Sequence, residues 1–399
     1  MVGVAVVAGV AVTRRRSQRL AMTAVFVGNG VAFGAWAANI PGVREAAHLQ
    51  NGALGVMLLC VSLGAVGAMQ VAGRYAGRIG TARASWIAGL LLMLALPMPA
   101  FVPGFGALLV SGMLLGLALG LLDVSMNAHA AWLEREWGTP IMSSFHAGWS
   151  LGQLLGAALA GGIAAWGLGV GWGLAVPAVV VGACCLAAFA LPEAPIERPV
   201  PQRLAWPDRT IVMLGVLVAC SFVIEGGTAD WSSVYLRTVL GASPAVASTS
   251  IAVFAGTMVV MRVVGDRLVA WAGPGRVVAG GGAVAGVGVL LAVLAPVLAP
   301  GLVPGLAAGV CGFALVGVGI ANIVPVLFSA AGARGAAGVA TVATAGYGAG
   351  LAAPPLIGWV SYGFGLQVGL LLLLIAAAGL IGLGRRGLSG RRAAHEPAA

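Results

Sequence analysis

A single carboxylate stands in a long apolar stretch of the sequence, and an amide follows it after one helical turn. The stretch runs from Gly116 to Ala131, its acid is Asp123, and Asn127 comes four positions later. In a helix, both residues share one narrow stripe with Gly116 and Gly120. A charge at the centre of a bilayer costs about 2.5–3.5 kcal/mol on insertion scales, so an acid there is a candidate functional residue. We favour a proton-coupling site; the alternative is a neutral acid that is hydrogen-bonded to a neighbouring helix.

A second carboxylate, Glu225, lies in another apolar stretch and is followed by two glycines. We interpret Glu225 as a second proton-coupling candidate. The pair Gly226 and Gly227 predicts an unwound point that frees backbone carbonyls for a ligand, with a tight helix crossing as the alternative. Asp230 comes seven residues before Arg237, which places both on one side of a helix. For these two we expect a structural ion pair or an outer gate rather than a contact with substrate.

Uncharged polar and aromatic residues at membrane depth are candidates to bind a hydroxylated solute. Amides can hydrogen-bond such a solute, although bridging neighbouring helices is their commoner role, and aromatic faces suit sugar rings or ordinary packing. The candidate substrate-binding residues are Asn29, Asn39, Asn127, Trp36, Gln153, Asn322 and Tyr347. His129 points about 120° away from the stripe of Asp123, and we expect it to form an interfacial hydrogen bond rather than a proton relay.

The composition excludes a soluble protein. Of 399 residues, 60% are hydrophobic and only 8% are charged. All basic residues are arginines, so a phosphate-binding loop of the Walker type is absent and an ATP-driven pump is disfavoured. The five cysteines lie inside apolar runs and form no metal-ligand spacing. We therefore expect no metal, no cofactor and, without a convincing nucleophile–base pair, no enzyme.

Apolar length and polar breaks predict an all-α integral membrane protein with twelve spans. The expected spans are 20–41, 53–73, 84–102, 105–131, 143–165, 170–191, 209–236, 245–265, 275–296, 302–328, 337–361 and 366–384. With the N-terminus inside, all but two of the 21 arginines are cytosolic, and only Arg44 and Arg237 are outside. This distribution follows the positive-inside rule and places both termini in the cytosol.

The sequence also predicts two related six-helix halves. His146–Gln153 (HAGWSLGQ) aligns with Thr344–Leu351 (TAGYGAGL), and Gly73–Gly80 resembles Met261–Leu268. Parallel repeats of this kind build carriers with a site near the bilayer midplane. The expected organisation is a cytosolic segment at 1–19, a bundle at 20–191, a linker at 192–208, a bundle at 209–384 and a cytosolic tail at 385–399.

These features resemble the major facilitator superfamily over essentially the whole chain. GRYAGRIGTAR at 73–83 is similar to a family loop that latches the cytosolic side, although Gly77 stands at its Asp position. The second copy keeps the acid–arginine pair. The resemblance implies latch residues at Gly73, Arg74, Arg78, Gly80, Arg83, Arg262, Asp266 and Arg267, with a topology anchor as the alternative reading.

A closer resemblance is to the bacterial YbjJ-like subgroup and, more distantly, to fucose permeases. It rests on LDVSMNA (122–128), PIMSSFH (140–146), DWSSVYLR (230–237) and ANIVPVLFSAAG (321–332). Fucose permeases carry an acid four positions before an Asn in the fourth helix, as Asp123 and Asn127 do, and use it in proton-coupled sugar uptake. They also carry an acid at the end of the first helix, for which this chain has no equivalent.

We therefore expect a symporter of the bacterial inner membrane that imports a sugar-like or other hydrophilic solute together with protons. The alternatives are proton-driven efflux of drugs or metabolites and a receptor or scaffold that does not transport. We expect the partners to be the solute, protons and the lipid bilayer, with no nucleic acid, and the protein to be a monomer.

Overall fold

The computed structural model describes residues 2–138, 141–194, 208–332 and 336–388. Within these ranges the side chains of residues 2–12, 69–78, 143, 266, 336, 337, 339, 340, 386 and 387 are not described. Helices make up all of the regular structure in the described part of the chain. Their apolar surfaces identify an all-α membrane protein.

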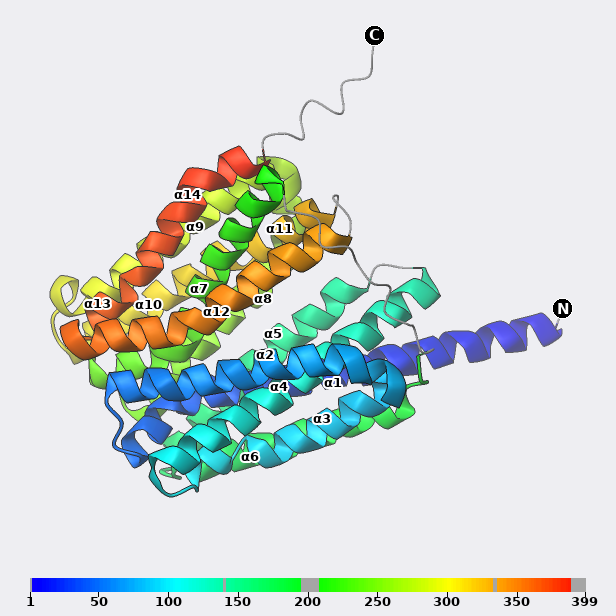
Figure 1. Ribbon diagram of the computed structural model, residues 1–399, viewed down its shortest axis with the longest axis horizontal. Coiled ribbons are helices and arrows are strands. Elements are labelled where there is room, and N and C mark those ends of the chain that lie inside the picture. The colour runs from blue at the N-terminus through cyan, green and yellow to red at the C-terminus, as the bar shows by residue number, and fades with distance from the viewer. Residues whose placement is uncertain (1, 139–140, 195–207, 333–335, 389–399) are drawn as a thin grey trace, which may run out of the picture. The chain divides into compact units, whose positions relative to one another are not determined.

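Most of the helices follow one another through short connections, and the longest interval separates α6 from α7 (Figure 1). They are α1 (Val2–Ala46), α2 (Asn51–Ile79), α3 (Thr81–Ala95), α4 (Gly104–Trp137), α5 (Met142–Ala165), α6 (Val170–Leu186), α7 (Arg209–Thr238), α8 (Pro244–Ala272), α9 (Pro274–Leu298), α10 (Leu302–Ile320), α11 (Ile323–Gly332), α12 (Ala336–Phe364), α13 (Leu366–Leu370) and α14 (Leu372–Leu388), with short 3₁₀ turns at Met98–Ala100 and Ala187–Ala190.

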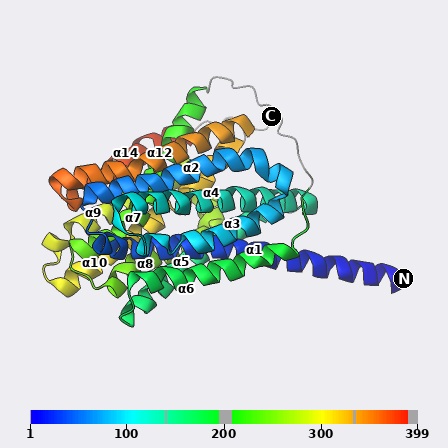
Figure 2. The ribbon, with the colours of Figure 1, turned by 60° about the horizontal axis from the view of Figure 1, so that its bottom comes forward.

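Ten helical segments are long and apolar enough to cross a membrane, counted over the described residues alone. The other two expected spans, 143–165 and 337–361, coincide with α5 and α12. Helix α1 is continuous from Val2 through the expected cytosolic segment and first span (Figure 2). The expected linker and tail lie largely outside the described residues.

The chain forms two compact units. Unit 1 comprises Met1–Trp36 and Cys60–Pro199, and unit 2 comprises Ala37–Leu59 and Val200–Ala399. Helices α1 and α2 therefore contribute to both units, and the hairpin that joins them belongs to unit 2. Because these units follow contacts rather than the sequence repeat, the six-helix bundles at 20–191 and 209–384 stay a prediction.

In unit 1, glycines bring helix backbones into direct contact. A Cβ on Gly116 would lie 2.6 Å from the carbonyl carbon of Val61, and one on Gly120 would lie 2.9 Å from the carbonyl carbon of Ala65. Helix α4 therefore packs against the backbone of α2 where the sequence placed two glycines on one stripe. The glycines serve a neighbouring helix, and this crossing positions the segment that carries Asp123.

In unit 2, the interruption of a membrane helix lies in a different place from the one the sequence suggested. Helix α7 runs unbroken through Gly226 and Gly227, and a Cβ on Gly227 would lie 2.7 Å from the side chain of Leu373. The tenth expected span is instead divided into α10 and α11 at Ala321 and Asn322. Four residues after Ala321 comes Pro325, which has no N–H to bond the Ala321 carbonyl. The prediction of an unwound point beside Glu225 was therefore wrong. Gly227 packs closely against Leu373 and Ile357, whereas a Cβ on Gly226 would meet no atom within 4 Å.

Candidate functional site

In the structure, Asp123 and Asn127 contact each other on α4, as their spacing predicts. The Asn127 side-chain amide donates hydrogen bonds to the carbonyl oxygen of Asp123 at 2.8 Å and to its Oδ1 at 3.1 Å. Both side chains are half-buried. Among the described residues, no arginine or histidine forms an ion pair with Asp123. In the described part of the chain, a membrane helix of unit 1 therefore carries a carboxylate whose one polar side-chain partner is a neutral amide.

Helices α1 and α5 bring a second polar group together in unit 1. The indole Nε1 of Trp149 donates to Oδ1 of Asn29 at 2.8 Å, and the rings of Trp149 and Phe33 lie 5.5 Å apart between centroids. A Cβ on Gly30 would lie 2.9 Å from the backbone nitrogen of Gln153, so the two helices touch along their backbones.

Two buried side-chain amides on α1 and α5 have polar atoms without a hydrogen-bond partner among the described residues. Nδ2 of Asn29 and Oε1 of Gln153 are buried and have no partner among the described residues. Buried polar groups without a partner are rare and costly, so a donor and an acceptor remain for a ligand or a water molecule. Trp149 is a candidate that the sequence analysis left out of the substrate-binding set. The sequence repeat could have indicated it, because Trp149 in HAGW aligns with the candidate Tyr347 in TAGY.

In unit 2, Glu225 forms an ion pair with an arginine that we expected in a cytosolic loop. Nη2 of Arg262 lies 3.9 Å from Oε1 of Glu225, and both side chains are largely buried. Helix α8 extends to Ala272, so Arg262 lies within a membrane-crossing helix rather than in a latch loop. The placement of Arg262 in that loop was wrong because α8 continues for almost three more helical turns, to Ala272, whereas the latch role of the segment stays a prediction.

The ion pair adjoins the break between α10 and α11. Nε of Arg262 donates to the free carbonyl of Ala321 at 3.4 Å, and the amide of Asn322 donates to the Met261 carbonyl at 2.9 Å. A Cβ on Gly265 would lie 2.8 Å from Cγ of Asn322, so only glycine leaves room for this amide. Asn322 therefore bridges helices, which is the commoner of the two roles expected for it.

The expected ion pair between Asp230 and Arg237 is absent from the described structure. Arg237 instead binds Glu45, with Nε to Oε1 at 2.6 Å and Nη2 to Oε2 at 3.3 Å, and donates to the Ala242 carbonyl at 2.8 Å. Asp230 is half-buried on α7 and forms no hydrogen bond or ion pair with the described residues. Asp230 is thus a further carboxylate in a membrane helix without a cationic partner among the described residues; of the two expected roles, the ion pair with Arg237 is not formed and the outer gate stays a prediction.

The other candidates lie apart from these clusters. Trp36 is 2% exposed and belongs to the packed core, whereas Asn39 is buried in unit 2. Tyr347 on α12 meets Phe222 edge to face at 5.4 Å. His129 on α4 hydrogen-bonds Thr81 at the start of α3, at 2.9 Å, which agrees with the expected interfacial bond.

The predicted latch segment at residues 73–83 contains no acidic residue, but a carboxylate from elsewhere in the chain contacts it. The backbone amide of Arg83 donates to Oε1 of Glu193 at 3.0 Å, and Nε of Arg83 lies 3.9 Å from the same oxygen. Gly80 adopts a φ of 93°, so the turn between α2 and α3 requires glycine. Glu193 was not among the predicted residues. The candidates Gly73, Arg74, Arg78 and Asp266 lie outside the described side chains, and Arg267 is exposed on α8.

Groups of three or more histidine, cysteine or acidic side chains that could hold a metal are absent from the described residues.

Comparisons with known proteins agree with this architecture. The model of the Major Facilitator Superfamily matches residues 20–354. An uncharacterized MFS-type transporter of Yersinia pestis is 33% identical over 380 residues, which cover 91% of this chain and 95% of the relative. The membrane protein MosC of Rhizobium meliloti is 32% identical over 376 residues, which cover 91% of this chain and 89% of the relative.

A solved structure supports the fold independently. A mutant form of the nucleoside transporter NupG has a TM-score of 0.74 and 12% identity, with 93% of this chain and 99% of that chain covered. At this identity the likeness shows the fold alone. Together with the family match over most of the sequence, the helices identify a multi-pass membrane transporter rather than an enzyme. The chain belongs to the Major Facilitator Superfamily.

Proposed function

We propose that this transporter imports a small hydrophilic, sugar-like solute together with protons, by alternating access, across a bacterial cytoplasmic membrane. One observation carries the proposal. Asp123 lies in a membrane-crossing helix, and among the described residues its only polar side-chain partner is the neutral amide of Asn127. Removal from water disfavours the charged form of a carboxylate that lacks a cationic partner, so such a group is suited to bind and release a proton.

The role of Asp123 follows from the difference between the two candidate coupling acids. Glu225 has Arg262 at 3.9 Å, so its negative charge is compensated in unit 2. Asp123 has no such cation among the described residues, so its charge is compensated chiefly by taking up a proton. We therefore assign the primary coupling step to Asp123 and a supporting role to Glu225.

The proposed solute class rests on the polar groups between α1 and α5. Asn29 offers a donor, Gln153 an acceptor, and Trp149 and Phe33 offer aromatic surface. A neutral, hydroxylated ring can satisfy both amides and stack on an indole. The distribution of arginines supports a cytosolic location for both termini, and the transporter is proposed to work as a monomer.

The test begins with a ligand screen and ends with flux. Purified wild type and Asp123→Asn are screened by thermal shift against sugars, organic acids, amino acids and drugs at two pH values. A ligand at 100 times its dissociation constant stabilises by about 2.7 kcal/mol, which is measurable. The ligand that is found is then used in proteoliposomes with a pH gradient of either sign, which separates import from efflux.

The control variant is Glu136→Gln, an exposed acid on the same helix. We expect Asp123→Asn to lose uphill accumulation and keep exchange of solute for solute, whereas Glu136→Gln retains both. Full uphill uptake by Asp123→Asn would refute the coupling role. Binding without flux in the wild type would instead support the receptor alternative.

A further inference from the structure

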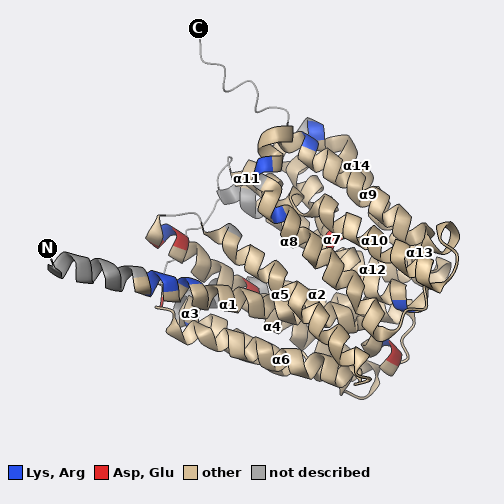
Figure 3. Ribbon diagram, turned by 180° about the vertical axis from the view of Figure 1, so that it is seen from behind, with Lys and Arg blue, Asp and Glu red and all other residues tan. Residues whose placement is uncertain are grey.

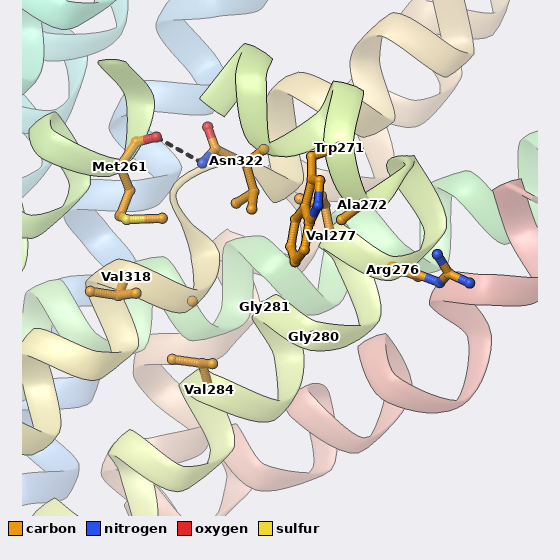
Figure 4. A pocket seen from close by; sticks show the side chains of 12 residues that line it. Met261, Trp271, Ala272, Arg276, Val277, Gly280, Gly281, Val284, Val318 and Asn322 are labelled. Atoms are coloured by element: carbon orange, nitrogen blue, oxygen red, sulfur yellow. Dashed lines mark hydrogen bonds between the residues drawn. The ribbon is translucent and has the colours of Figure 1, made fainter. Parts of the chain in front are cut away.

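Unit 2 contains a cavity of about 510 Å³ whose lining residues include neither Glu225 nor Arg262. It is enclosed by the last turns of α8, the first turns of α9 and the end of α10 (Figure 4). This volume falls within the range of about 300–1,000 Å³ that accommodates drug-sized ligands. The cavity is therefore large enough for part of an amphipathic molecule.

The cavity is polar at one side and apolar elsewhere. Val284 and Val318 line one part of it, while Arg276 lies at the opposite edge and Trp271 stands between (Figure 4). The amide of Asn322 is already bonded to the Met261 carbonyl, so its donor is committed to the protein. Two glycines, Gly280 and Gly281, leave a backbone wall without side chains. The interior is thus suited to hydrocarbon.

Arg276 lines the polar edge of the cavity, Arg267 precedes the lining residue Leu268 on α8, and Arg385 of α14 lies beside Gly275. Arg267 on α8, Arg276 on α9 and Arg385 on α14 are all exposed, and none of them forms an ion pair with the described residues. The start of α9 touches the end of α14, because a Cβ on Gly275 would lie 3.3 Å from Cα of Arg385. Figure 3 shows basic segments gathered at this end of the unit. The edge of the cavity therefore carries positive charge that no described acid offsets.

We propose that this cavity is a binding site for an anionic phospholipid. The phosphate contacts Arg276 within the basic edge, and part of an acyl chain occupies the space bounded by Val284 and Val318. Trp271 is 84% exposed beside the edge, as expected of an indole that lies among lipid headgroups. Basic pockets between membrane helices bind anionic headgroups by the same combination of charge and apolar surface.

A free phosphate ion fits these observations less well than a lipid does. It would use the arginines but leave the apolar walls unoccupied. A lipid uses both, and its chain would reach the amide of Asn322, which adjoins the α10–α11 break. A bound lipid would therefore contact the α10–α11 break, whose Ala321 carbonyl accepts a hydrogen bond from Arg262. This inference goes beyond the proposed function and does not depend on proton coupling.

The test uses a substitution that fills the cavity without disturbing the helices. A Cβ on Gly280 meets no atom within 4 Å, so Gly280→Leu projects into the free space. Gly382→Leu is the matched control, because Gly382 on α14 is equally open and does not line the cavity. Purified protein is incubated with equal amounts of phosphatidylglycerol and phosphatidylcholine, and retained lipid is counted by native mass spectrometry.

We expect wild type and Gly382→Leu to retain one phosphatidylglycerol with at least a tenfold preference, and Gly280→Leu to lose it. Arg276→Gln should lose the preference for the anionic lipid, whereas Arg209→Gln, an exposed arginine elsewhere in unit 2, should keep it. Trp271→Ala should weaken retention, whereas Trp166→Ala, with the same 84% exposure, should not.

Inorganic phosphate and glycerol phosphate serve as headgroup probes. Displacement of the lipid by either at millimolar concentration would show a phosphate site and overturn the proposal. Equal retention by Gly280→Leu and wild type would also overturn it, as would equal retention of the two lipids by wild type. If Gly280→Leu fails to fold, the Arg276 and Trp271 variants decide the question.

Discussion

The contact between α4 and α2 makes a quantitative prediction about Gly116. In Gly116→Ala the new Cβ would lie 2.6 Å from the Val61 carbonyl carbon and 3.0 Å from the Ala65 nitrogen. Non-bonded carbons rest about 3.5–4.0 Å apart, so the two helices must separate by about 1 Å. Overpacking of this kind costs about 1–3 kcal/mol. The main obstacle is backbone, which cannot rotate away as a flexible side chain would.

Gly67→Ala on α2 is the matched control, because a Cβ there meets no atom within 4 Å. Both substitutions replace a glycine in a helix interior and gain up to about 1 kcal/mol of helix propensity. Their difference therefore isolates the helix contact. We expect Gly116→Ala to be less stable than Gly67→Ala by about 1–3 kcal/mol in detergent unfolding followed by tryptophan fluorescence. Equal stabilities of the two variants would refute the proposed backbone contact.

Two ion pairs make further predictions. The pair of Glu45 and Arg237 is partly exposed, at 43% and 31%, so a double-mutant cycle with Gln should give a coupling energy of only about 0.2–1 kcal/mol; a coupling near zero would contradict the bidentate geometry. For Glu225 and Arg262, which are 26% and 19% exposed, Arg262→Gln alone should destabilise more than the double variant with Glu225→Gln, because the single change leaves a buried acid uncompensated. Thermal unfolding of the three variants measures the order, and a double variant less stable than the single one would contradict it.

Local sequence patterns predicted the helices well because length and hydropathy decide whether a segment can cross a membrane. The sequence analysis predicted a helix interruption at the glycine pair 226–227 and not at Ala321 and Asn322, although Pro325 lacks the N–H that would bond the Ala321 carbonyl. A glycine pair breaks a helix only where the surroundings leave room. Leu373 and Ile357 pack against Gly227 and hold α7 straight. Such contacts with residues distant in the sequence cannot be predicted from the local sequence.

The partners of charged residues were harder to predict than their positions. Asp230 and Arg237 do share a helix side, but seven residues separate them by about 10.5 Å along the axis, which is long for a direct contact. Arg237 reaches Glu45 at the end of α1 instead, a residue 192 positions away. Spacing within one helix therefore predicted that two residues share a side, but it could not predict a partner from another helix. For the same reason the ion pair between Glu225 on α7 and Arg262 on α8 was not predicted.

The two matching segments of the sequence repeat make different side-chain contacts in the structure. Trp149 and Tyr347 occupy matching positions of the repeat, and each contacts the first helix of its own half. Trp149 bonds the amide of Asn29, whereas Tyr347 meets the ring of Phe222 edge to face, so the helix pairing is repeated with different aromatic side chains. In unit 1 the uncompensated acid Asp123 accompanies the spare amide groups of Asn29 and Gln153. In unit 2 the coupling candidate Glu225 is compensated by Arg262, and the acid without a partner among the described residues is Asp230, which is not one of the two coupling candidates. This asymmetry is the physical reason to seek solute and proton contacts first in unit 1.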